Sequence, residues 1–128
     1  MKTKFIILMI LTFSVTTFAD TSFRYLANDC ESGDAKACLK AGKLYSNDPE
    51  NAQYSASDAA SIAANYYKRS CLLGYAEGCT TYGMHFYADT ERDPKKDDLY
   101  YFKKGCDGGD QTGCTLLKMA PHAENSEP

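Results

Sequence analysis

Residues 30–38 read CESGDAKAC, and the same kind of segment returns as CLLGYAEGC at 71–79 and as CDGGDQTGC at 106–114. Each copy has seven residues between its two cysteines, a glycine three residues after the first cysteine and a small residue directly before the second. The copies align without gaps, and their first cysteines are 41 and then 35 residues apart. Self-similarity at such a period is typical of stacked supersecondary units.

Two helices are expected around each copy, one that ends inside it and one that begins there. An apolar pair lies five and four residues before each first cysteine, as Tyr25-Leu26, Tyr66-Tyr67 and Tyr101-Phe102. The glycine after that cysteine can take the left-handed conformation that closes a helix. The sequence therefore predicts an all-α fold, a short α/α solenoid of helix-turn-helix repeats, with helices at about 20–32, 34–46, 57–73, 75–87, 95–108 and 110–119.

The segments between the copies carry signals that start and separate helices. Ser55 and Ser57 with Asp58 precede an alanine-rich run, and Pro94 suits a first helical position. The polar stretch 46–51 accommodates the six residues by which the first period exceeds the second. Helices this short are marginal alone, so we expect stacking to stabilise them.

The cysteine spacing predicts one disulfide inside each copy. An even number of cysteines, a spacing repeated three times and an export signal favour the pairs Cys30–Cys38, Cys71–Cys79 and Cys106–Cys114. A zinc site would need more closely spaced ligands and a reducing compartment, and the chain has only His85 and His122 as further ligands. We therefore expect disulfides, with no metal and no cofactor.

The N-terminus has the features of a secretory signal peptide. Lys2 and Lys4 precede the apolar run 5–15, and small residues stand at 17 and 19. The run is shorter than the roughly 20 apolar residues that a membrane-spanning helix needs. We expect cleavage after Ala19, a repeat domain at 20–118, a flexible tail at 119–128, and a location in the bacterial periplasm or outside the cell.

The charge balance of the expected mature chain limits its partners. Removing residues 1–19 takes away two of the 14 basic residues and none of the 17 acidic ones, which leaves a net charge of −5. Such a chain is a poor ligand for nucleic acid, because phosphate binding requires excess positive charge. About 109 residues suffice for one domain with a modest core, and we expect a monomer without a membrane span.

The chain resembles a known family of helical repeats. Ala63, Tyr66, Tyr67, Arg69 and Cys71 follow the pattern A-x-x-Y-Y-x-K-x-C, which recurs less closely before Cys106. Over nearly all of residues 23–118 the sequence is similar to the Sel-one-like repeats, relatives of the tetratricopeptide repeat, in the form found in the Helicobacter cysteine-rich proteins. The resemblance implies that each disulfide joins the second helix of one repeat to the first helix of the next.

The same resemblance raises the possibility of β-lactam binding or hydrolysis, since members of the family have been described as penicillin-binding proteins and weak β-lactamases. The residues offer little support for an enzyme. A serine β-lactamase requires a Ser-x-x-Lys pair and a Lys-Thr-Gly segment, and the chain has neither. No catalytic residue can therefore be assigned, and we interpret His85 as a partly buried core residue and His122 as part of the polar tail.

Three lysines form the candidate binding site. Lys36, Lys40 and Lys43 are spaced to share one stripe of the expected helix 34–46. In proteins that resemble this one, that helix lines the concave face. We expect the chain to bind a protein or peptide, and the lysines favour an acidic one. The alternatives are a β-lactam or peptidoglycan-type ligand, and an inhibitor or immunity role against a toxin or host protein.

Overall fold

The computed structural model describes residues 18–48, 54–87 and 94–120, and these ranges contain helices and no strand. Every helix bound lies within two residues of its predicted position, so the all-α prediction is confirmed. In chain order the helices are α1 (Phe18–Glu31), α2 (Ala35–Asn47), α3 (Ala56–Leu72), α4 (Ala76–Tyr87), α5 (Pro94–Asp107) and α6 (Gln111–Met119).

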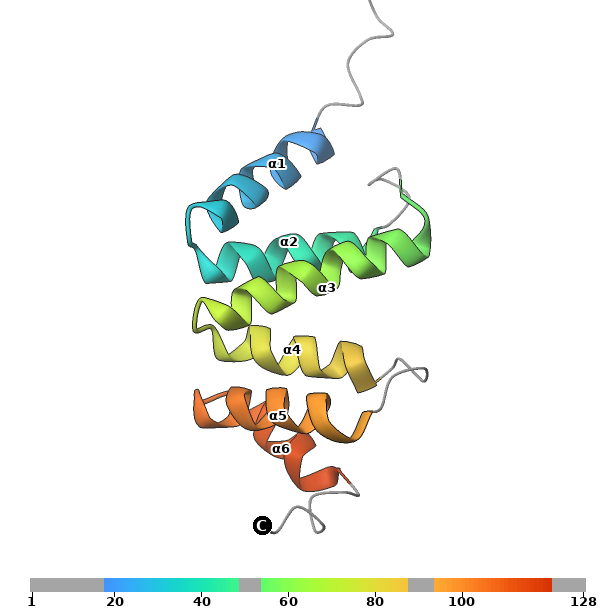
Figure 1. Cartoon of the computed structure of the whole chain (residues 1–128). Helices are drawn as coiled ribbons and strands as arrows, with labels where there is room; N and C mark the ends of the chain where they lie inside the picture. The colour runs from blue at the N-terminus through green and yellow to red at the C-terminus, as the bar shows by residue number, and fades with distance from the viewer. Residues whose placement is uncertain (1–17, 49–53, 88–93, 121–128) are drawn as a thin grey trace, which may run out of the picture.

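The helices form a single stack in which each helix packs on the next one along the chain (Figure 1). Beyond these sequential contacts, α2 packs on α4 and α4 packs on α6, whereas α3 and α5 approach each other less closely. The even-numbered helices are thus closer together on their side of the stack. Such a difference in spacing makes the side of α2, α4 and α6 the inner side of the curve, as in other solenoids.

Three disulfides close the hairpins. Cys30–Cys38 joins α1 to α2, Cys71–Cys79 joins α3 to α4, and Cys106–Cys114 joins α5 to α6, with Cα–Cα distances of 4.5, 4.4 and 4.5 Å. The pairing is the one that the spacing predicts, and no cysteine is free. Disulfides persist in oxidising compartments, so the three bonds indicate an extracytoplasmic setting.

The geometry of the turn explains the seven-residue spacing. In the first copy, the Gly33 amide donates to the Cys30 carbonyl and the Asp34 amide donates to the Asp29 carbonyl, which is a Schellman helix end. The Cys38 amide then donates to the Asp34 carbonyl, the first hydrogen bond of the next helix. The same bonds recur in both other copies, and the glycines at 33, 74 and 109 all have a φ of 91° to 100°. Each disulfide therefore joins the last turn of one helix to the first turn of the next.

Helix starts are fixed by side chains that accept backbone hydrogen bonds. Ser55 accepts from the Asp58 amide and begins α3, and α5 begins at Pro94, as the sequence predicts. Two further caps were not predicted: Asp34 accepts from the amides of Lys36 and Ala37, and Asp110 accepts from the Gly113 amide. The aspartates serve both as the last residue of the turn and as the cap of the next helix.

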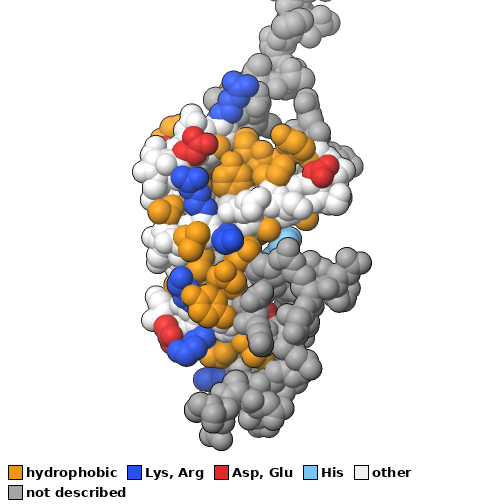
Figure 2. All heavy atoms as spheres, in the orientation of Figure 1, with side chains coloured by type: hydrophobic (Ala, Val, Ile, Leu, Met, Phe, Trp, Pro, Cys, Tyr) orange, Lys and Arg blue, Asp and Glu red, His pale blue; other side chains and the backbone are white. Residues whose placement is uncertain are grey.

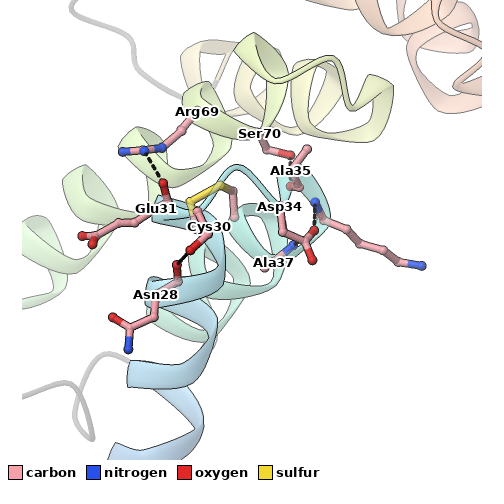
Figure 3. The surroundings of a disulfide bond; sticks show 11 residues. Asn28, Cys30, Glu31, Asp34, Ala35, Ala37, Arg69 and Ser70 are labelled. Atoms are coloured by element: carbon pink, nitrogen blue, oxygen red, sulfur yellow. Dashed lines mark hydrogen bonds between the residues drawn. A yellow bond between two sulfur atoms is a disulfide. The ribbon is translucent and has the colours of Figure 1, made fainter.

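The end of α3 also holds the turn between α1 and α2 (Figure 3). The buried Ser70 hydroxyl donates to the Ala35 carbonyl at 2.7 Å, and the Arg69 guanidinium donates to the Glu31 carbonyl at 3.3 Å. These two bonds tie the first hairpin to the second independently of the disulfides.

The core is narrow and rich in aromatic and small residues. Its buried centre contains Leu39, Tyr45, Ala63, Tyr67 and Tyr82. Close packing is possible because Gly42 faces the Tyr67 ring and Gly83 faces the Phe102 ring. The described helices include none that is long and apolar enough to cross a membrane.

Several predictions lie wholly or partly outside the described residues. They concern the signal peptide, the part of the 46–51 stretch beyond Asp48, the C-terminal tail and His122. Within the described part, Ser46 and Asn47 belong to α2, so the predicted polar stretch begins as helix. α1 starts at Phe18, two residues before the expected mature N-terminus, and the domain boundaries stay predictions.

Candidate functional site

The inner side of the stack presents a continuous stripe of exposed side chains on α2. Six residues of this helix, Ala37, Cys38, Leu39, Ala41, Gly42 and Tyr45, point into the core. Lys36, Lys40, Lys43 and Leu44 are exposed, and their spacing places them on one face of the helix. We call this stripe, with Glu77, Thr81 and Met84 at the equivalent positions of α4, the inner face.

The structure places all three lysines on this face, but they differ in whether a carboxylate is paired with them. Lys43 donates to the Glu77 carboxylate of α4 at 2.7 Å, and both side chains remain nearly half exposed. The pair spans two successive inner helices, and exposed pairs of this kind contribute at most about 1 kcal/mol. No described carboxylate is paired with Lys36 or Lys40, so these two lysines keep their charge available for a ligand.

A shallow hollow adjoins the lysines at the junction of α1 and α2. The described residues that line it are Ser22, Tyr25 and Leu26 of α1 and Lys40 of α2. Tyr25 is 68% exposed, although the residue type and position match tyrosines that pack against other helices in the following repeats. The hollow thus combines an ammonium group with apolar and aromatic surface, which suits an amphipathic segment.

A cluster of aromatic rings packs against the core side of α2. The Phe23 ring meets the Tyr45 ring edge-on at 4.3 Å, and the Tyr66 ring stacks on Tyr45 at 5.9 Å. Burial, and then charge repulsion from the Tyr66 and Tyr54 phenolates, raise the pKa of Tyr45 to about 12. Burial is also the main cause that raises the pKa of Tyr66. Both phenols are neutral at physiological pH. The cluster therefore adds no charge to the inner face and serves to pack α2 against its neighbours.

Exposed apolar side chains occur along the whole stack (Figure 2). In the view of Figure 2 the Lys and Arg side chains lie mainly along the edge where the hairpin turns are found. The exposed large apolar residues are Tyr25, Leu44, Tyr54, Leu72, Leu73, Met84, Tyr100 and Met119. Leu44 and Met84 belong to the even-numbered helices, which adds apolar area beside the lysines.

The remaining candidates have no comparable surroundings. His85, in the last turn of α4, is partly buried, which agrees with its interpretation as a packing residue. Among the described residues, no group of His, Cys, Asp and Glu side chains could hold a metal ion. In the same part of the chain, no buried side-chain nitrogen or oxygen atom lacks a hydrogen-bond partner.

The sequence missed two features of this site. The sequence does not identify Glu77 as a partner of Lys43, because this pairing depends on how α2 and α4 lie in the stack. The hollow exists because none of the described helices covers Tyr25, which only the arrangement of α1 reveals. Comparison with known proteins adds nothing to these assignments, because no family model, no curated protein and no solved structure matches the chain.

Proposed function

We propose that this chain is an exported protein- or peptide-binding module, acting in the periplasm or outside the cell, whose repeats are Sel-one-like. Its inner face binds an acidic segment of the partner. The observation that carries the proposal is the pair of exposed lysines, Lys36 and Lys40, that no described carboxylate neutralises. In a chain with a net charge of −3, a local basic stripe is selective for acidic ligands.

The surroundings of these lysines support a peptide over a small ion. Lys40 borders the hollow that contains Tyr25 and Leu26, so a ligand can combine charge pairing with apolar contact. Glu77 limits the basic stripe on one side by neutralising Lys43. A segment with carboxylates near Lys36 and Lys40 and an apolar side chain over the hollow would use both features.

A titration with a fluorescein-labelled glutamate-rich peptide tests the proposal, with neutral and lysine-rich peptides of the same length as controls. The variant Lys36→Gln/Lys40→Gln removes two charges from the inner face, and glutamine has nearly the helix propensity of lysine. The matched control, Lys68→Gln/Lys103→Gln, removes two exposed charges from the outer helices α3 and α5.

We expect the inner-face variant to weaken acidic-peptide binding about tenfold at low salt, with a smaller difference at high salt because salt screens exposed charges. The outer-helix variant should bind like the wild type. Equal losses in both variants would show non-specific attraction and would contradict the proposal. A β-lactam turnover assay on the same protein tests the hydrolase alternative, which rests on the family resemblance alone.

A further inference from the structure

The apolar pair that precedes each first cysteine is more deeply buried in the second and third hairpins than in the first. Tyr67 of α3 is 5% exposed and Phe102 of α5 is 2% exposed. Leu26 of α1 holds the same place in the repeat but is partly exposed, and its neighbour Tyr25 is 68% exposed. The first helix therefore displays a surface that the following repeats bury.

In the second and third hairpins, the second residue of the pair lies against a glycine of the preceding even-numbered helix. A β-carbon added to Gly42 of α2 would lie 2.5 Å from the Tyr67 ring, and one added to Gly83 of α4 would lie 2.9 Å from the Phe102 ring. Tyr82, the residue before Gly83, meets the Tyr101 ring edge-on at 4.6 Å. The fold thus uses one interface repeatedly: an inner helix presents a glycine to the apolar pair of the next outer helix.

In the described part of the chain, no helix precedes α1 to make this interface. The hollow lined by Ser22, Tyr25, Leu26 and Lys40 lies beside the pair of α1. Within the described residues, the N-terminal end of the stack therefore has the receiving half of the interface, and no inner helix fills it.

The charges of the stack indicate what the missing helix should carry. Lys43 directly follows Gly42, and its ammonium group pairs with Glu77 of the next inner helix. Glu77 stands two residues before the second cysteine of its copy. Lys36 holds the same place in the preceding inner helix, α2. A helix that covers Tyr25 and Leu26 in the same way would direct the residue after its glycine toward Lys36. Because Lys36 is basic, that residue should be acidic.

We propose that the N-terminal end of the stack, formed by Tyr25, Leu26 and Lys36, docks an α-helix of a partner protein that presents Gly or Ala followed by Asp or Glu. The inference rests on the proposed function and names the secondary structure and sequence of the bound segment. A second copy of this chain does not fit, because α6 has Leu117, Lys118 and Met119 at the corresponding positions. Lys118 would replace the required small residue, and Met119 would offer Lys36 no carboxylate.

The chain itself supplies a probe. A helix-stabilised synthetic peptide of residues 76–87 carries Gly83, and the changes Cys79→Ala and Met84→Glu remove its thiol and place the acidic residue after the glycine. Two matched peptides carry Met84→Lys in place of Met84→Glu, or Gly83→Leu in addition to it. Each is labelled and titrated into the exported, oxidised protein and into its Lys36→Glu variant.

The Met84→Glu peptide should bind the wild type about tenfold more tightly than either matched peptide. The preference between glutamate and lysine should reverse in the Lys36→Glu protein, and a fold defect cannot produce such a reversal. Binding that ignores the glycine and the charge, or no binding of any of these peptides, would overturn the inference. If the helical peptides fail while the glutamate-rich peptide still depends on Lys36 and Lys40, the proposed function stands alone. If neither the helical peptides nor the glutamate-rich peptide binds, the inference and the proposed function are both wrong.

Discussion

Gly42 of α2 lies against the Tyr67 ring of α3 so closely that a β-carbon at position 42 would be 2.5 Å from ring atom Cε1. The ring cannot easily move aside, since Tyr67 is 5% exposed and its hydroxyl is 2.9 Å from the Ser46 hydroxyl. The Ala63 carbonyl limits the site further at 3.1 Å. This contact sets the distance between the first two disulfide-linked hairpins.

Gly42→Ala should therefore destabilise the protein, although alanine favours a helix more than glycine does. Overpacking costs about 1–3 kcal/mol, and the gain in helix propensity offsets up to about 1 kcal/mol of it. We expect a net loss of about 1–2 kcal/mol in chemical denaturation. An exposed helical control such as Gln111→Ala should change stability little. A Gly42→Ala variant more stable than the wild type would contradict the packing described here.

The cap at the start of α6 offers a second test. The Asp110 carboxylate accepts from the Gly113 amide at 3.1 Å, and Asp110→Ala leaves that donor without its partner. We expect a loss of about 1 kcal/mol in the free energy of unfolding, measured with urea. Asp110→Asn should retain most of the stability because its amide oxygen can still accept. Equal losses in both variants would show that the charge, and not the hydrogen bond, matters.

The sequence predicts most of the fold because the decisive features are local. The spacing of Cys30 and Cys38 follows from one helix end, one turn and one helix start, all within nine residues. Asp34 was missed as a cap because Tyr75 stands at the same position of the second copy, which hides the pattern. The Lys43–Glu77 pair joins residues 34 positions apart, and no local rule determines which side chains face each other across stacked helices.

The disulfides should open in a defined order under limiting reductant. Both cysteines of Cys30–Cys38 are 0% exposed, whereas Cys106 and Cys114 are partly exposed in the last hairpin. Thiol exchange requires access to a sulfur atom, so Cys106–Cys114 should be reduced first. Timed alkylation followed by mass spectrometry measures the order, and the three bonds should open at similar rates in denaturant. First opening of Cys30–Cys38 in the folded protein would contradict the structure.

The aromatic cluster predicts a loss of stability at high pH. Burial, and charge repulsion from the neighbouring tyrosines, raise the pKa of Tyr45 from 10.0 to about 12, so the folded state holds this proton more strongly than the unfolded state does. The stabilising contribution is complete below pH 10 and is lost as the pH rises toward 12. Tyr45→Phe should make the free energy of unfolding less dependent on pH in this interval. Short urea titrations at pH 8 and at about pH 11 measure the difference. An identical pH dependence in both proteins would show that Tyr45 is not the group responsible.

We propose that the inner face, and not another side of the stack, binds an acidic segment. Nuclear magnetic resonance of the isotope-labelled protein tests it directly, by following the backbone amide signals during titration with the glutamate-rich peptide. We expect the shifts to concentrate at Lys36, Lys40 and Thr81, on α2 and α4, while the signals of Lys68 and Lys103 on the outer helices stay unchanged. Shifts confined to α3 and α5, or no shifts at saturating peptide, would contradict it.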